Sequence, residues 1–243
     1  GYTSFTFQVV DGGSNTGPDN VNTDTTANTL TIDVAPVNDA PALGGTASTI
    51  SYAENAAAAL IDTNITVSDP DIATSGSFNG GFLQAALTTN GTATDQLSIN
   101  ATGSGATAIA ISGSSVTYGG TTIGTLDSTL NGVNGSALKI TLNSNATLAA
   151  TQALARSIAF SNSSDNPSTA QRTVTFTLDD GANGGNGALQ ATRTATINVS
   201  ASNDAPVISN LLASKTFTTG SPAQLIDSDV TVDDPDSANL NGG

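Results

Sequence analysis

Short runs in which apolar and polar residues alternate recur along the chain, separated by segments rich in Gly, Asn and Asp. Residues 5–9 and 30–34 form one pair of such runs, and residues 174–178 and 197–199 form a second pair. An alternation of period two predicts strands that bury one face. Further strands are predicted at 49–53, 64–67, 82–88, 96–101, 107–112, 115–118, 121–126 and 138–142. The pattern therefore predicts an all-β protein of antiparallel β-sandwiches.

One segment departs from this alternation. Between residues 147 and 158, Leu148, Leu154, Ala155 and Ile158 fall on one face at helical spacing. Asn145 or Thr147 could cap the first turn of such a helix. We expect a short helix packed on the sandwich.

The chain also repeats itself at a separation of 165 residues. The motif NDAP at 38–41 returns at 203–206, and residues 60–71 return as 225–236 with eight of twelve positions identical. Self-similarity at a fixed period indicates a tandem array, and we expect this chain to be a segment of a longer polypeptide. The predicted pieces are the C-terminal strands of one repeat at 1–36, a complete repeat at 37–201 and the N-terminal part of the next at 202–243.

Composition narrows the chemistry that the chain can perform. Among its 243 residues there is no Cys and no His, which excludes disulfides, thiolate metal sites and histidine-based catalysis. Twenty acidic and five basic residues give a net charge of −15, which disfavours nucleic acids and anionic membrane surfaces as partners. No apolar run is long enough to span a membrane. Cations bound by oxygen are the remaining candidate for a stabilising cofactor.

The acidic residues that recur with the repeat are the candidate ligands. Asp69 and Asp71 flank Pro70, Asn38 and Asp39 precede Pro41, and Asp179 and Asp180 follow a late strand. Loops at one end of a sandwich converge from distant parts of a chain, and Ca²⁺ prefers six to eight oxygen ligands. The alternative for each acid is a turn or cap residue. That alternative is preferred for Asp62 and Asp227, and for Asp11 or Asp180 taken alone, whereas Asp33, Asp95 and Asp127 are expected to be solvated.

The order of these motifs resembles a known family. Strand, Asp-Gly loop and strand lead to PVNDAP, followed by YAEN at 52–55, VSDPD at 67–71 and NG at 79–80. This resembles the cadherin repeat in the bacterial cadherin-like form found in giant surface and secreted proteins. The resemblance implies Ig-like sandwiches with calcium between consecutive repeats. The implied ligands are Asn38, Asp39, Asp69, Asp71, Asp179 and Asp180 at the first junction, and Glu54, Asn203, Asp204, Asp234 and Asp236 at the second. By the same logic Asp11 would serve a linker upstream.

The sequence departs from the family in the middle of the repeat. Cadherins carry an Asp-Arg-Glu motif there, whereas this chain has the predicted helix and residues 162–165. Thr219 also stands where Glu54 stood in the preceding copy. We therefore expect fewer ions at each junction than in vertebrate cadherins.

These inferences predict a non-catalytic, calcium-binding structural repeat of an extracellular bacterial surface protein. A catalytic carboxylate pair is the weaker interpretation of Asp69 and Asp71, because the pair is duplicated together with the linker. The alternative function is a glycan- or protein-binding adhesion module. The expected partners are calcium ions and neighbouring repeats or copies of the same protein, including self-assembly through exposed strand edges.

Overall fold

The computed structural model describes residues 2–12, 26–35, 37–72, 76–181, 187–237 and 240. Of the described residues, 44% lie in strands and 6% in helices, so this part of the protein is predominantly β. This confirms the predicted β character with one short helix. The chain divides into two units, Gly1–Val37 and Asn38–Gly243. The organisation into three repeat pieces stays a prediction.

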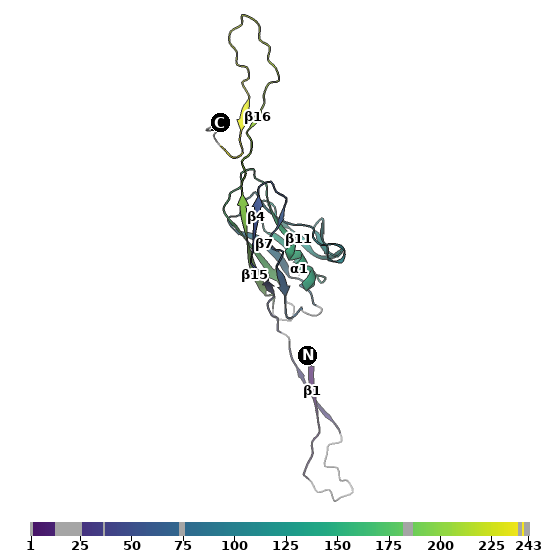
Figure 1. The fold of residues 1–243 in the computed structure, drawn as a ribbon. Helices are drawn as coiled ribbons and strands as arrows, with labels where there is room; N and C mark the ends of the chain where they lie inside the picture. The colour runs from purple at the N-terminus through teal and green to yellow at the C-terminus, as the bar shows by residue number, and fades with distance from the viewer. Residues whose placement is uncertain are drawn as a thin grey trace. The chain divides into compact units, whose positions relative to one another are not determined.

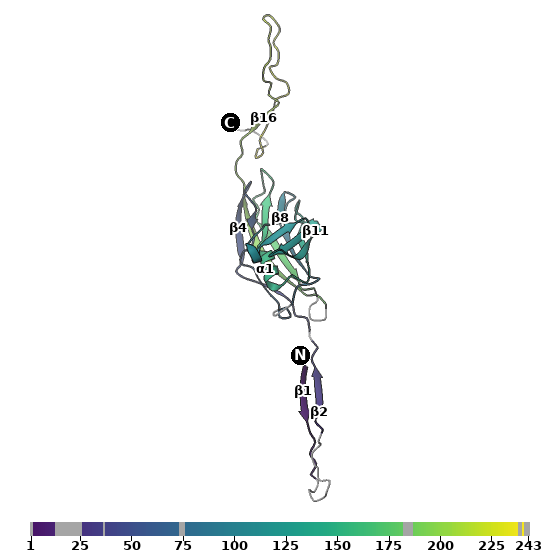
Figure 2. The same ribbon diagram turned by 90° about the vertical axis from the view of Figure 1, so that its right-hand side faces the viewer.

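The first unit is a pair of antiparallel strands, β1 (Tyr2–Phe7) and β2 (Asn28–Asp33), which lie side by side in Figure 2. Phe5 lies opposite Leu30 in the register. Alternation sets the two faces of the pair, yet Phe5 and Phe7 are each 50% exposed. No second layer covers either face among the described residues of this unit.

The second unit is built on an eight-stranded sheet whose strand order is β4-β15-β14-β7-β12-β11-β10-β9. These strands are β4 (Ser48–Ala53), β7 (Phe82–Thr89), β9 (Ile109–Ser112), β10 (Ser115–Tyr118), β11 (Thr121–Asn131), β12 (Leu138–Leu142), β14 (Arg172–Asp179) and β15 (Gln190–Ser200). Figure 1 shows β4, β7 and β15 running alongside one another.

The prediction of purely antiparallel sheets is wrong at one edge of this sheet. β4 and β15 run parallel, with Ile50 opposite Ile197, whereas the other neighbouring pairs are antiparallel. Only a tight hairpin forces two strands to be antiparallel. More than a hundred residues connect β4 to β15, so the chain can return in the same direction.

Three smaller sheets complete the unit. One has the order β5-β13-β8, and the other two are the pairs β3-β6 and β16-β17. Their strands are β3 (Ala42–Gly44), β5 (Ala59–Leu60), β6 (Thr66–Ser68), β8 (Asp95–Ile99), β13 (Ile158–Asn162), β16 (Val207–Ser209) and β17 (Thr231–Asp233). The pair β3-β6 lies at the start of the unit and carries the segment that leads into the Asp-Pro-Asp motif.

One hydrophobic core joins the large sheet to the three-stranded sheet. Leu83 and Phe176 from the former and Leu97 and Phe160 from the latter belong to the same buried cluster. The Tyr52 ring of β4 meets Phe160 edge-on at 5.2 Å. Each such buried side chain contributes about 1.5–3 kcal/mol, so this core holds the loops at both ends of the strands in place.

The predicted short helix is present as α1 (Leu148–Arg156), which follows a 3₁₀ turn, η1 (Gly105–Thr107), in chain order. Thr147 caps α1, since its side chain accepts a hydrogen bond from the Ala150 backbone at 3.3 Å. Ala150, Leu154 and their buried neighbours face the core. Ile158 does not extend the helix as expected, because it begins β13.

Candidate cation-binding clusters

The structure gathers most of the predicted ligands into two groups within the second unit. The first acidic cluster consists of Asn38, Asp39, Asp69, Asp71 and Asp180. The second acidic cluster consists of Asp165, Asp204, Asp234 and Asp236, flanked by Glu54 and Asn203. Asp11 lies in the other unit and is exposed.

In the first acidic cluster, the Asp-Pro-Asp turn is tied to the linker. Asp69 Oδ1 accepts a hydrogen bond from the Asp71 backbone N–H at 2.8 Å. Asp71 Oδ2 in turn accepts one from the Asp39 N–H at 2.7 Å. The bond within the turn aims the two carboxylates, and the second bond brings the linker against them. Two motifs 30 residues apart in sequence thus meet as the sequence predicts.

The second acidic cluster repeats these two hydrogen bonds. Asp234 Oδ1 accepts from the Asp236 N–H at 3.0 Å, and Asp236 Oδ2 accepts from the Asp204 N–H. Each of these residues stands 165 positions after its counterpart. The self-similarity of the sequence therefore extends to the local geometry of the two clusters.

Asn38 connects the linker to the late strand. Its Nδ2 donates to Asp180 Oδ2 at 2.7 Å and to the Gly187 carbonyl at 3.0 Å. Asp180 directly follows β14 and is fully buried, and its Oδ1 accepts from the Leu189 N–H at 2.9 Å. The acid after the late strand and the linker amide therefore form one hydrogen-bonded group.

Asp179 behaves differently from Asp180. Its Oδ1 accepts from the Gly181 N–H at 3.0 Å, and its Oδ2 accepts from Gln190 Nε2 at 2.9 Å. Successive residues of a strand point to opposite faces. The alternation thus directs Asp180 to Asn38 and leaves Asp179 bonded to its own hairpin.

Buried oxygens without hydrogen-bond partners distinguish these clusters from the rest of the protein. Among the described residues, five buried side-chain nitrogen or oxygen atoms lack a partner, and all five are oxygens of predicted ligands: Asn38 Oδ1, Glu54 Oε1 and Oε2, Asp69 Oδ2 and Asp204 Oδ2. Leaving such an atom unsatisfied costs about 1–3 kcal/mol, and more when it is charged. Each atom is therefore available to an additional ligand.

The electrostatics of the first acidic cluster oppose ionisation of Asp69. Only 3% of this residue is exposed, and burial raises the pKa of its carboxyl. Backbone hydrogen bonds from Asp71 and Ile72 lower the pKa, while the charges of Asp180 and Asp71 raise it further, and the net direction is upward. The cluster thus holds its carboxylates together against their mutual repulsion.

The second acidic cluster shows the same effect and adds a residue that the sequence did not predict. The pKa of Asp204 is raised by partial burial first, and then by the charges of Asp236, Asp165 and Asp234. Asp165 belongs to the loop after β13, and its neighbour Asn166 donates to the Pro235 carbonyl at 3.3 Å. The sequence did carry a signal for this residue. Asp165 is an acid in the polar stretch 163–166, in the region where cadherins have the Asp-Arg-Glu motif that this chain lacks.

Glu54, the single glutamate of the chain, lies at the end of β4, next to the strand β15 that leads to the second acidic cluster. It follows β4, and its backbone N–H donates to the Ser200 carbonyl at 3.0 Å, where β15 leads towards Asn203. Glu54 is 8% exposed and neither carboxylate oxygen has a partner. Asn203 is exposed, and its Nδ2 donates to the Asp204 carbonyl at 3.0 Å.

Two buried acids outside the clusters, Asp62 and Asp95, have charged partners. Asp62 caps the Asn64 N–H in a turn, as predicted, and also pairs with Arg193 Nε at 2.8 Å. The prediction that Asp95 is solvated is wrong, because Asp95 is fully buried and pairs with the fully buried Arg172 at 3.3 Å. Asn162 Nδ2 also donates to Asp95 at 2.6 Å, so the protein provides every partner that burial demands.

The chemistry of the two clusters suits a hard cation. Their free donors are carboxylate and amide oxygens, the ligands that Ca²⁺ and Mg²⁺ prefer. Within the described ranges, no three acidic side chains already converge as a complete metal-binding group. A cation would therefore have to draw the side chains of a cluster closer together.

Comparisons with known proteins assign no family. No protein-family model matches the chain, and no curated protein is significantly similar to it. In the part of the chain that the structure describes, no helix has the length and apolar character needed to cross a membrane.

Proposed function

We propose that this chain is a non-catalytic, calcium-binding structural repeat of a long extracellular protein of the bacterial surface. In this proposal, cadherin-like sandwiches follow one another, and calcium at their junctions stiffens the array. The biological role would be that of an adhesin stalk, a filament or a matrix component.

The observation that carries the proposal is the distribution of unsatisfied oxygens. Every buried, unpartnered side-chain polar atom of the described residues belongs to a residue that the repeat or the cadherin resemblance indicates as a calcium ligand. Folding rarely leaves buried carboxylate oxygens unpaired unless a further group satisfies them. A divalent cation satisfies several such oxygens at once and also offsets the repulsion that raises the pKa of Asp69 and Asp204.

Calcium fits this donor set better than magnesium. Calcium accepts irregular sets of six to eight oxygens, whereas magnesium demands a near-ideal octahedron. Asn38, Asp69, Asp71 and Asp180 come from three separate segments and include an amide oxygen. Extracellular modules bind calcium at about 10⁻⁴–10⁻³ M, so occupancy would call for an extracellular setting.

Hydrogen bonds of the linker support the stiffening role. The Asp39 N–H and the Asn38 side chain join the linker to Asp71 and Asp180. Mutual repulsion of these carboxylates acts against the close arrangement that both bonds require. Neutralising the cluster therefore fixes the linker, and removing the cation frees it.

The architecture is compatible with a cadherin-like sandwich. An eight-stranded sheet and a three-stranded sheet share one core, and the loops that carry the two acidic clusters follow strands of this body. Strand β4 adds to β15 at the edge and leads directly to Glu54. In this proposal, the sandwich formed by the two sheets would carry one acidic cluster at its junction with the preceding repeat and the other at its junction with the following repeat.

The proposal is tested by thermal unfolding in millimolar calcium, in equal magnesium and in chelator. A control variant, Asp127→Asn, removes a carboxylate that accepts backbone hydrogen bonds from Thr129 and Leu130 but lies outside both clusters. We expect calcium, and not magnesium, to raise the Tm of the wild type and of this control. Equal Tm values in calcium and in chelator would overturn the proposal.

A further inference from the structure

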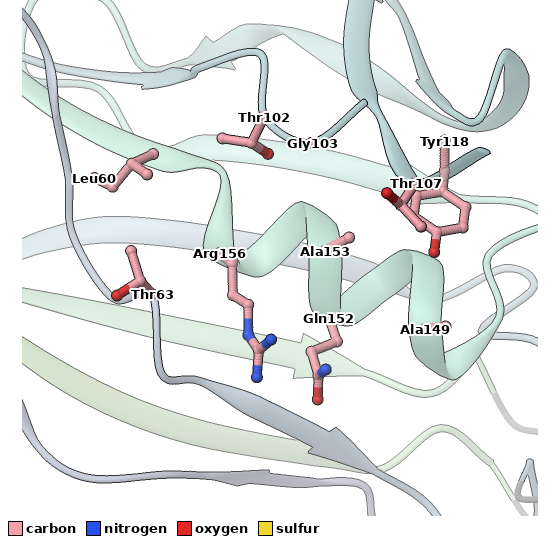
Figure 3. Close-up of a pocket in the computed structure, with 10 residues that line it drawn as sticks. All are labelled: Leu60, Thr63, Thr102, Gly103, Thr107, Tyr118, Ala149, Gln152, Ala153 and Arg156. Carbon is pink, nitrogen blue, oxygen red and sulfur yellow. The ribbon is translucent and has the colours of Figure 1, made fainter. Parts of the chain in front are cut away.

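A hollow of about 360 Å³ lies beside α1, and none of the residues that line it belongs to either acidic cluster. We call it the α1 groove. Ala149 and Ala153 form its floor, as Figure 3 shows. Residues four apart share one face of a helix, so two alanines at this spacing leave that face bare. Its volume falls within the range of about 300–1,000 Å³ that is typical of small-molecule sites.

The walls of the α1 groove carry hydrogen-bonding groups around one aromatic ring. Thr102, Thr107 and Tyr118 line one side, and Gln152 and Arg156 extend from the helix along the other (Figure 3). A hydroxyl both donates and accepts, and so matches the hydroxyls of a sugar. The face of a tyrosine ring offers apolar contact to the C–H groups of a sugar ring.

The polar side chains on the helix are held in place before any ligand arrives. Gln152 Oε1 accepts from the Val67 N–H at 3.1 Å, and Arg156 Nε donates to the Ile65 carbonyl at 2.8 Å. Fixing a side chain in advance lowers the entropic cost of binding. The Nε bond orients the guanidinium while using only one of its five N–H donors.

Arg156 differs from the other two arginines of the chain. Arg172 and Arg193 each form an ion pair with a buried aspartate, whereas Arg156 makes no ion pair within the described residues. A guanidinium with free terminal nitrogens binds a carboxylate in a bidentate manner. Arg156 is therefore the arginine whose guanidinium could pair with a carboxylate that a ligand supplies.

A second hollow of about 370 Å³ adjoins the first. Tyr118 lines both, and the second hollow adds Thr121, Ser144, Asn145 and Thr147. Its additional polar groups are hydroxyls and an amide. Two hollows that share one aromatic residue suit consecutive units of a chain better than a single compact molecule.

We propose that the α1 groove binds an acidic saccharide, with a uronate carboxylate on Arg156 and a neighbouring sugar unit beyond Tyr118. The ligand would be an oligosaccharide that bears carboxylates, and its binding would not require calcium. The array would then carry a recognition site on each complete repeat, in addition to its structural role. The negative charge of the protein opposes an anionic ligand at long range, so each site would bind weakly.

The proposal is tested by titrating trigalacturonate into the ¹⁵N-labelled chain with chelator present, while amide shifts are recorded by NMR. Galactotriose and acetate serve as matched probes for the sugar and the carboxylate alone. We expect shifts at Thr102, Tyr118 and Gln152 with trigalacturonate, and weaker binding of both matched probes. Equal affinity for galactotriose, or for acetate, would overturn the assignment of an acidic saccharide.

Two variants connect that binding to the groove. Ala149→Leu fills the floor at an exposed position, where leucine keeps the helix, and should weaken binding at least about tenfold. Arg156→Lys keeps the charge but loses the bidentate fork, and should weaken trigalacturonate binding while leaving galactotriose unaffected. Lys139→Gln removes a cation that lies over the Phe82 ring, outside the groove, and should change neither. Undiminished binding by Ala149→Leu would place the ligand elsewhere and contradict the proposal.

Discussion

Two buried aspartates in one unit meet opposite environments. Asp95 is fully buried and is paired with Arg172 and Asn162. Asp69 is 3% exposed, lies among other acids and has an oxygen without any partner. The protein thus supplies a cationic partner for one buried carboxylate and none for an oxygen of the other; in the proposed function, calcium fills that second role. Burial alone therefore does not separate the two aspartates, whereas the absence of a partner for Asp69 Oδ2 does, and the calcium proposal rests on that difference.

The largest expected effect comes from removing Arg172, the partner of the paired aspartate Asp95. Arg172→Leu would leave Asp95 as an unpaired buried charge and should lower the free energy of unfolding by about 3–5 kcal/mol. Arg172→Lys keeps the charge and should lose less. Urea unfolding in calcium and in chelator measures both variants. The loss should be the same in the two conditions, and a loss that depends on calcium would contradict the distinction drawn here.

The next largest effect is expected from removing carboxylates of the first acidic cluster. Asp69→Asn with Asp71→Asn should remove calcium stabilisation of about 1.4–2.7 kcal/mol, the value for a site at 10–100 times its Kd. In chelator the same double variant should unfold at equal or higher urea concentration than the wild type, because it removes repulsion. This reversal of sign between calcium and chelator is the decisive readout. A destabilisation of equal size in both conditions would show that the two acids serve only the turn.

A smaller effect is expected from the second acidic cluster. Asp204→Asn with Asp236→Asn should abolish one class of calcium sites in a calorimetric titration and leave the other intact. Its effect on unfolding should be smaller than that of the first cluster, because β16 and β17 are exposed and outside the core. Loss of both classes of sites in this variant would mean that the clusters are not independent.

The smallest effect is a dependence of stability on pH in the absence of metal. The folded protein raises the pKa of Asp69 and Asp204, so it binds more protons than the unfolded chain in that range. Their contribution to stability is therefore greatest at low pH and falls as pH rises from the ordinary carboxyl range through the raised pKa. Urea unfolding between pH 3 and 7 in chelator should show this fall, and Asp69→Asn should reduce it. A contribution from these residues that grows with pH would contradict the electrostatic account.

The sequence predicted strands better than it predicted burial. The alternation at 5–9 matches that at 174–178. Residues 5–7 lie in β1, which pairs with β2, and residues 174–178 lie in β14, which pairs with β15. Phe176 is fully buried whereas Phe7 is 50% exposed, because β13 and β8 supply a second layer to the second unit. Strand β13 was not predicted, since it begins directly after Ser157 ends α1, with no turn signal between them.

The candidate sites were predicted where the repeat carried the information. The duplication of the linker and of the Asp-Pro-Asp turn was sufficient to predict that the linker residues Asn38 and Asp39 lie near Asp69 and Asp71. The approach of Asp165 to the second acidic cluster and the pairing of Asp95 with Arg172 depend on strands and loops from distant parts of the fold, which the repeat does not specify. The α1 groove arises from the bare alanine face of a predicted helix, but its opposite wall comes from residues 102–118.

The most direct test is a crystal structure of the chain grown in millimolar calcium, with anomalous diffraction to identify the ion. The account predicts an anomalous peak in the first acidic cluster, with Asp69 Oδ2 and Asn38 Oδ1 at about 2.3–2.6 Å from it. A weaker peak is expected beside Asp204. Well-ordered clusters that contain only water at that calcium concentration would contradict the account.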